Sequence, residues 1–247
     1  MLRLIEKLKK VKDFRNPSGR RHQLWVVLLI IILGIMQSYT GYRAIGDFAK
    51  YNQALLTKYF KLPSEKMPSY STIRRILMGL DWSGLLDIFN EWAKEEYHDK
   101  EGLDWIAVDG KCLRNTVINH DEATQNFVMF ASFWEHIKSY IKVERYGERD
   151  GKEYYNSAYY ISSLVENAQT FAQKIRGHWK IENQLHWVKD VIFKEDTLPL
   201  TDFQAISNLS ILQTIALNLF RGLGFLSITK GQRWLDNRWF RLCDLLE

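Results

Sequence analysis

The sequence predicts an α/β (α+β) fold in which helices come first, a group of strands follows and helices then return. Residues 1 to about 98 carry apolar side chains at helical spacing. After Asp104 the chain changes to short apolar or alternating runs that are typical of strands. Helical spacing returns from Asn167, so we expect helices packed on a sheet behind an all-helical N-terminal module.

The first helices differ in how much apolar surface they carry. Leu2 to Lys12 is amphipathic, and Leu24 to Met36 is an unbroken apolar run of 13 residues. A membrane-spanning helix needs about 20 residues. The segment before the run contains acids, and no small-residue cleavage site follows it. We therefore predict a fully buried helix and no membrane association. Helical spacing resumes from Tyr42 to Tyr51.

The segment after Pro68 has the features of a capped helix. Ser69 and Ser71 are suitable N-caps, and an apolar pair with Arg74 and Arg75 follows. This order is typical of the start of a helix-turn-helix recognition helix, and it fits a capped surface helix as well. A further amphipathic helix is expected from Trp82 to Glu96, with its apolar face toward the core through Leu85, Leu86, Ile88, Phe89 and Trp92.

Four strands are expected in the middle of the chain. Their ranges are Trp105 to Val108, Phe127 to Trp134, Ser139 to Glu144 and Glu153 to Leu164. Asp150-Gly151 between the last two predicts a hairpin turn. Helices are then expected from Asn167 through Val191 and from Asn208 to Phe220, before a basic, aromatic tail from Lys230 to Phe240.

The positive charge is concentrated at the N-terminus. The first 21 residues hold eight basic and two acidic side chains, so their net charge is +6. The net charge of the whole chain is +5, so the remaining residues are close to neutral, at −1. Clustered cations such as Arg20 and Arg21 suit a phosphate backbone or an anionic membrane, and a solvated helix end is the alternative. The two cysteines form no disulfide framework and no metal cluster, which fits a reducing cytoplasm.

Two carboxylates are candidates for chemistry. Asp109 follows a short apolar strand and precedes a glycine, where it can project from the edge of a sheet or form a hairpin turn. Glu182 is expected on a helix with His178 and His186 four residues away on either side. A polar helix shoulder with ion pairs is the alternative. Three ligands spaced along a straight helix splay too far apart for zinc. Lys189, two turns on, is placed to meet a DNA phosphate.

Phosphodiester chemistry gives a physical reason to pair these acids. Two hard cations about 4 Å apart need several carboxylates that converge from different elements. Such acids lie far apart in sequence and close in space, which fits Asp109 and Glu182 without proving that they meet.

The chain resembles the ISAs-type, H-repeat-associated branch of the DDE insertion-sequence transposases. One matching block runs from the basic N-terminus through Ser71-Thr72-Ile73-Arg74-Arg75 to Val108-Asp109-Gly110-Lys111-Cys112-Leu113-Arg114. The other runs from about Trp134 through Tyr159-Tyr160-Ile161-Ser162-Ser163-Leu164 and Gly177-His178-Trp179 to Phe193-Lys194-Glu195-Asp196.

This resemblance implies a ribonuclease-H-like catalytic domain. Asp109 would be its first catalytic aspartate and Glu182 its catalytic glutamate. By the resemblance, the two acids hold two Mg²⁺ or Mn²⁺ ions that cut and join DNA at the ends of the element. The family's second aspartate has no counterpart here, because Phe133 runs directly into a segment that resembles a much later part of the family. Only 72 residues separate Asp109 from Glu182, so an internal deletion near 133–134 is expected.

The expected organisation is a basic, DNA-binding helical module at 1–100 and a truncated ribonuclease-H-like domain at 101–247. The expected function is that of a transposase with a defective metal site, acting on double-stranded DNA at element ends and at the target, self-associating on DNA in the bacterial cytoplasm. The candidate DNA-binding residues are Arg20, Arg21, Arg74, Arg75 and Lys189. A DNA-binding remnant that inhibits a full-length relative is the alternative, and a small helical protein with no DNA role is a third hypothesis.

Overall fold

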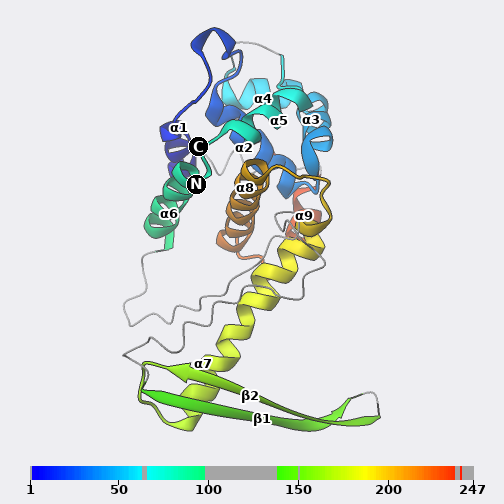
Figure 1. The fold of residues 1–247 in the computed structure, drawn as a ribbon. Coiled ribbons are helices and arrows are strands. Elements are labelled where there is room, and N and C mark those ends of the chain that lie inside the picture. Colours follow the sequence, from blue (N-terminus) through cyan, green and yellow to red (C-terminus); the bar gives the residue numbers. More distant parts are fainter. Residues whose placement is uncertain (1, 63–65, 98–137, 150, 237–239, 241–247) are drawn as a thin grey trace. The chain divides into compact units, whose positions relative to one another are not determined.

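The computed structural model describes residues 2–62, 66–97, 138–149, 151–236 and 240, and these form two compact units (Figure 1). The larger unit joins the described residues up to 97 with those from 182 onward. The smaller unit holds the described residues from 138 to 181. The strands expected at 105–108 and 127–134, and Asp109 itself, lie outside the described residues.

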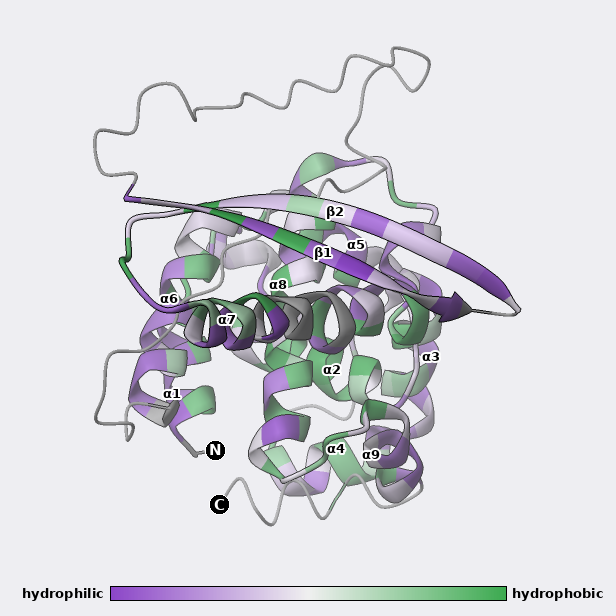
Figure 2. Cartoon of the chain, turned by 90° about the horizontal axis from the view of Figure 1, so that it is seen from below, coloured by the Kyte–Doolittle hydropathy of each residue, from purple (hydrophilic) through white to green (hydrophobic). Residues whose placement is uncertain are grey.

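The centre of the larger unit is α2 (Leu24–Met36). Because this helix is apolar on every side, it is stable only when surrounded by other apolar surface. All of its residues except Trp25 are buried, as predicted. Figure 2 shows it as an apolar helix among its neighbours, and it packs against α1 (Leu2–Lys10), α3 (Gly41–Tyr51) and α8 (Phe203–Gly222).

Four more α-helices complete this core. They are α4 (Gln53–Phe60), α5 (Tyr70–Gly79), α6 (Trp82–Tyr97) and α9 (Ile228–Leu235). The expected face of α6 is confirmed at Leu85 and Trp92, which are 1% exposed, and at the partly buried Ile88 and Phe89, but Leu86 does not belong to the core cluster. Lys7 of α1 links α1 to α6, because its Nζ lies 3.0 Å from Glu91 Oε2 and 2.6 Å from Glu95 Oε1 of α6. These carboxylates raise the pKa of Lys7.

Among the described residues, α8 is the one single helix that is long and apolar enough to cross a membrane. Its apolar window is 61% buried by the rest of the protein, as in the central helix of a globular core. The pair α2 and α3 passes the same criterion only when joined across a bend of 100°. The helix α8 begins at Phe203, five residues before the start predicted at Asn208. Asp202 caps it by accepting a 2.8 Å hydrogen bond from the Ala205 backbone N–H.

Asn208 of α8 holds the end of α5. This fully buried side chain donates from Nδ2 to the Leu77 carbonyl at 2.9 Å and to the Leu80 carbonyl at 2.7 Å. Gln204, one turn earlier, also donates to the Leu80 carbonyl at 2.8 Å. Carbonyls at the end of a helix lack partners within that helix, so α8 supplies the partners that α5 requires.

Replacement of Asn208 by leucine is expected to lower the free energy of unfolding by about 1–3 kcal/mol, because it strands the buried Leu77 carbonyl. Urea denaturation followed by circular dichroism measures this loss. Gln204→Leu is the matched control and should cost less, because the Leu80 carbonyl keeps Asn208 as a donor. An Asn208→Leu variant as stable as the wild type would show that these bonds do not fix α5.

The smaller unit contains a hairpin and a helix. Strands β1 (Ser139–Arg149) and β2 (Lys152–Ser162) pair antiparallel, with Ser139 opposite Ser162 and Arg149 opposite Lys152. Gly151 has φ +72°, which the turn requires and which a glycine adopts without strain. The predicted hairpin is confirmed. The helix α7 (Ala168–Ile181) follows. In the described ranges the fold is thus helix-rich, with one two-stranded sheet.

Candidate nucleic-acid interface

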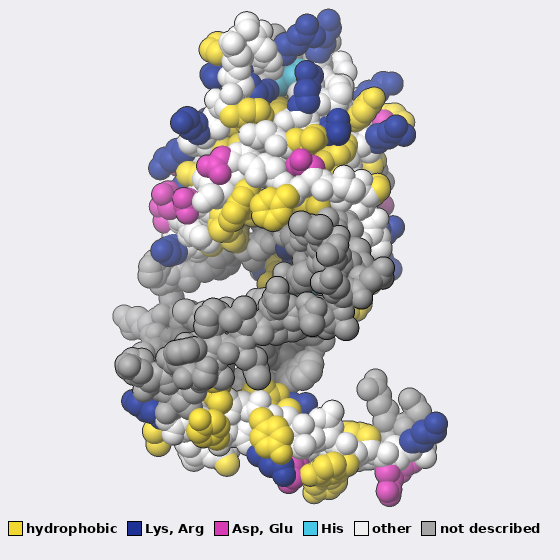
Figure 3. Space-filling model, in the orientation of Figure 1, with side chains coloured by type: hydrophobic (Ala, Val, Ile, Leu, Met, Phe, Trp, Pro, Cys, Tyr) yellow, Lys and Arg dark blue, Asp and Glu magenta, His cyan; other side chains and the backbone are white. Residues whose placement is uncertain are grey.

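A hollow of about 1110 Å³ lies in the larger unit between the loop that precedes α2 and the N-terminal half of α5. Arg15, Arg21 and His22 line it from the loop, and Lys66, Ser71 and Arg75 line it from the other side. No acidic side chain is among its described lining residues. We call it the loop hollow. Figure 3 shows that Lys and Arg side chains gather over the end of this unit that carries the loop and α5.

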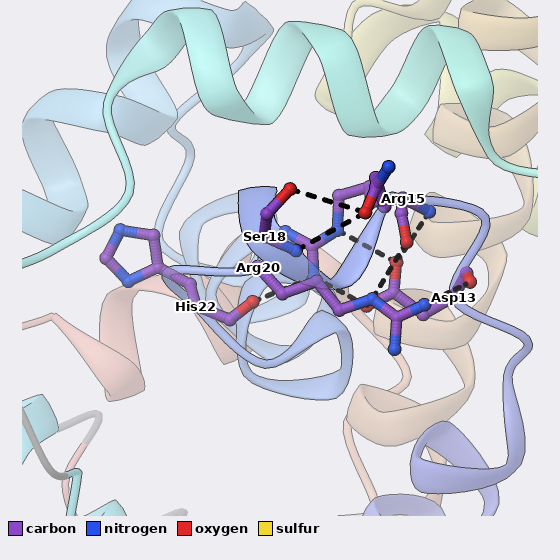
Figure 4. Close-up of polar contacts among 6 residues, drawn as sticks. Asp13, Arg15, Ser18, Arg20 and His22 are labelled. Carbon is purple, nitrogen blue, oxygen red and sulfur yellow. Dashed lines mark hydrogen bonds and ion pairs between the residues drawn. The ribbon is translucent and has the colours of Figure 1, made fainter.

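A carboxylate inside the loop fixes its shape (Figure 4). Asp13 Oδ1 accepts from Arg15 Nε at 2.9 Å, and Asp13 Oδ2 accepts from Arg15 Nη2 at 2.8 Å. This two-point pairing is the strong geometry of an arginine with a carboxylate. Arg15 Nη2 also donates to the His22 carbonyl at 2.8 Å, so one guanidinium joins both ends of the loop.

The two neighbouring arginines of the loop have different surroundings. Arg20 donates from Nε to the Arg15 carbonyl at 2.8 Å and from Nη2 to the Asp13 carbonyl at 3.2 Å, so its guanidinium is used within the loop. The Arg21 side chain is exposed and makes no hydrogen bond or ion pair with the described residues. Of the two predicted contacts, Arg21 is therefore the one whose charge faces the loop hollow.

The first turn of α5 forms the other wall. Ser69 caps the helix by accepting from the Thr72 backbone at 3.4 Å, which confirms the predicted cap. Arg75 is exposed and lines the loop hollow, with Nε donating to the Ser71 carbonyl at 3.3 Å. Arg74 is exposed but does not line it. The positive end of the helix dipole adds to the field of these cations.

Two titratable groups report the electrostatics of the loop. The hydrogen bond from Arg15, more than any other cause, holds the pKa of Asp13 below its ordinary value of 3.8. Burial, followed by the charges of Arg15 and Arg21, lowers the pKa of His22 below 6.5. A phosphate placed in the loop hollow would oppose the two arginine charges and favour protonated His22.

The stability that Asp13 contributes is expected to depend on pH. Because its folded-state pKa is depressed, this contribution is present above pH 3.8 and is lost as the pH falls through the folded-state value. Asp13→Asn should therefore lower the free energy of unfolding at pH 7 by on the order of 1.5 kcal/mol. Urea denaturation at several pH values should show this difference shrinking below pH 3.8. A difference that does not change with pH would contradict an ionised Asp13–Arg15 pair.

The segment around Glu182 is helical but not a regular α-helix. Glu182–His186 and Val188–Ile192 are π-helical, with Trp187 between them. π-Helical turns are rare and are frequent at functional sites. Their wider spacing means that residues four apart no longer lie directly above one another. The expected alignment of His178, Glu182 and His186 on one face of an α-helix therefore does not apply from Glu182 onward.

Lys189 lies inside the protein. It is 7% exposed, and its Nζ lies 2.9 Å from Glu195 Oε1 and donates to Ser210 Oγ at 2.6 Å. To reach a DNA phosphate, this ammonium group would have to leave these partners. Its role as a DNA contact stays a prediction.

The predicted metal site cannot be assembled from the described side chains. Asp109 and the side chain of Glu182 fall outside them, and in the described ranges no three His, Cys, Asp or Glu side chains are grouped as metal ligands. The roles of Asp109 and Glu182 stay predictions, and we derive no chemical step through a metal.

Sequence reasoning missed several residues of the loop hollow. Arg15 belongs to the basic N-terminal run, but nothing in the sequence shows that Asp13 orients it. Lys66 precedes the predicted cap by three residues, and only the fold brings it to the loop. A signal existed for His22, which follows the Arg20-Arg21 pair directly.

Comparison with known proteins now identifies the family. A family model described as "DDE_Tnp_1-associated" matches residues 5–93, and the model "Transposase DDE domain" matches residues 81–219. The second match covers more than half of the 247 residues. The chain belongs to the DDE insertion-sequence transposase family, as its resemblance predicted.

Individual relatives agree with this assignment. "Putative transposase YncI" of Escherichia coli O157:H7 is 36% identical over 139 residues, which are 55% of this chain and 34% of the relative. "H repeat-associated putative transposase YbfD" of Escherichia coli K12 is 26% identical over 114 residues, which are 46% of this chain and 44% of the relative. The chain thus spans less than half the length of these curated relatives. No solved structure matches it.

Proposed function

We propose that this chain binds double-stranded DNA through the loop hollow and α5, as a transposase-family protein whose cutting activity is lost. The observation that carries the proposal is the convergence of Arg15, Arg21, Lys66 and Arg75 on one hollow, whose described lining residues include no acid. Three of these come from outside α5 and are brought to it by the fold.

The physical basis of binding is release of counterions from the phosphate backbone by clustered cations. The capped start of α5 adds backbone N–H groups that suit an anion. The proposed DNA partners are the ends of an insertion element and its target, with self-association of the chain on DNA. The proposed setting is the bacterial cytoplasm, near the nucleoid.

The proposed loss of cutting rests on the carboxylates. Family membership supports Asp109 and Glu182 as ligands for Mg²⁺ or Mn²⁺, which would activate a nucleophile and stabilise the leaving oxygen of a DNA strand. The second aspartate of the family has no counterpart in this sequence, so the proposed site has one ligand too few.

A second candidate function is inhibition of a full-length relative. It is favoured by the composition of the loop hollow, whose described lining holds several cations that can bind phosphate without a metal. DNA binding there does not require the metal site. A chain that occupies element ends without cutting them would compete with an active transposase for those ends.

The test of lost cutting is incubation of labelled duplex DNA from the flanks of the encoding locus with the purified protein and Mn²⁺ or Mg²⁺. We expect no nicking by a folded protein that still binds the DNA. Specific nicking that Glu182→Gln abolishes would show that a third ligand has been recruited, and the proposed defect would be wrong. Nicking that survives Glu182→Gln would indicate a contaminating nuclease. Protein purified free of that nuclease must then show no nicking.

A further inference from the structure

A second hollow, of about 520 Å³, lies beside the first. Its wall is formed by α3 and by residues 66–70, and we call it the α3 hollow. Lys66, Met67 and Ser69 line both hollows, so the segment that leads into α5 separates them. The capped start of α5 therefore stands between two hollows rather than at the edge of one.

The α3 hollow also carries positive charge. Among its described lining residues are Arg43, Lys50 and Lys66, with Asp47 as the one acid. The guanidinium carbon of Arg43 lies 5.8 Å from the centre of the Tyr70 ring, which holds this cation beside the first residue of α5. Tyr70 is 51% exposed.

A glycine sets the distance between α3 and α5. A Cβ atom added at Gly46 would lie 3.0 Å from the Tyr70 backbone nitrogen and 3.2 Å from the Tyr70 Cβ. Only glycine allows this approach without a shift of the backbone. The close packing of the two helices places Arg43 and Lys50 along one side of α5, while Arg21 and Arg75 lie along the other.

We propose that the first turn of α5 enters a groove of duplex DNA, and that the two hollows hold the phosphates of its two strands. The inference rests on the proposed DNA binding and adds its geometry. The major groove is about 12 Å wide and admits an α-helix, with one phosphate backbone on each side. Cations on both sides of a capped helix match that arrangement. Tyr70 and Ser71, exposed in the first turn, then face the base edges.

The experiment compares two double variants, Arg43→Gln with Lys50→Gln and Arg21→Gln with Arg75→Gln. The affinity of each for a short labelled duplex is measured by fluorescence anisotropy over a range of salt concentrations, and again for one strand of that duplex. Lys94→Gln with Lys230→Gln is the matched control, since both lysines are exposed and line neither hollow. Circular dichroism confirms that each variant is folded.

Each phosphate contact contributes about 0.9 to the slope of log affinity against log salt on duplex DNA. Either pair of substitutions should therefore lower the duplex slope by about 2, and their combination by about 4. A single strand can occupy either hollow, so removal of one pair should change its slope by less. The control pair should leave both slopes unchanged.

The outcomes separate the inference from the function on which it rests. If the Arg43 and Lys50 pair leaves the duplex slope unchanged while the Arg21 and Arg75 pair lowers it, the two-strand arrangement is wrong and DNA binding through the loop hollow stands. If both pairs lower the slopes for duplex and single strand equally, one strand occupies both hollows and the inference is again wrong. If neither pair has an effect, both proposals fall.

Discussion

Replacement of Lys189 by methionine is expected to lower the free energy of unfolding by about 3–5 kcal/mol, because it removes the cation that pairs with the buried Glu195 carboxylate. The side chains of Lys189 and Glu195 are 9% and 4% exposed, and their charged atoms lie 2.9 Å apart. Lys189 Nζ also donates to Ser210 Oγ at 2.6 Å. Urea denaturation at neutral pH measures the loss.

The matched control replaces both members of this pair. Lys189→Met combined with Glu195→Leu removes both charges, so it should cost much less than the sum of the two single substitutions. Equal and additive losses would show that the two side chains do not interact. The same variants also test the predicted DNA role of Lys189, since the loss of a phosphate contact would lower the salt dependence of DNA affinity in a folded Lys189→Met protein.

Replacement of Phe48 by alanine is expected to cost about 3–5 kcal/mol of stability. This ring is fully buried where α3 crosses α2, and its centre lies 5.3 Å from that of the Tyr39 ring. It also lies 3.4 Å from the position that a Cβ atom would take at Gly34 of α2. Removal of the ring leaves a cavity that two helices cannot close without moving. Denaturant unfolding of the Phe48→Ala variant and the wild type measures this loss of stability.

Leu226→Ala is the control for the Phe48 substitution. Leu226 is 86% exposed, so its truncation should change stability by no more than about 0.5 kcal/mol. If Phe48→Ala cost as little as this control, the contact between α2 and α3 would not be part of the core. A normal urea m-value in both variants would show that the unfolding transition itself is unchanged.

Those parts of the fold that depend on local pattern could be predicted from the sequence. The uninterrupted apolar run of α2 predicts burial by itself, and its bounds agree with the structure. The Asp150-Gly151 pair predicts the hairpin, and Ser69 predicts the start of α5. In each case the signal and the structure that it predicts lie within a few residues of each other.

Features that depend on distant partners could not be predicted. Lys189 looks like an exposed cation in the sequence, and only the fold brings Glu195 and Ser210 around it. The π-helical turns at 182–192 have no known signal in single residues. The helix α4 was not predicted either, because Gln53–Phe60 is short and carries only one buried residue, Leu56.

The candidate interface shows the same division. The basic N-terminal run predicts a surface for phosphates, and Arg21 and Arg75 meet at one hollow. The sequence cannot distinguish Arg21 from Arg20, whose guanidinium is bound within the loop. That difference arises from the backbone carbonyls that the loop presents, which depend on the Asp13–Arg15 pair.

The most direct test of DNA binding through the loop hollow is the salt dependence of affinity for the locus-flank duplex. The Arg21→Gln with Arg75→Gln protein should bind more weakly than the wild type, with a slope reduced by about 2. Asp109→Asn with Glu182→Gln should leave the slope unchanged. If the arginine variant kept the wild-type affinity and slope, or if the carboxylate variant lost binding while folded, DNA would not be bound through the loop hollow.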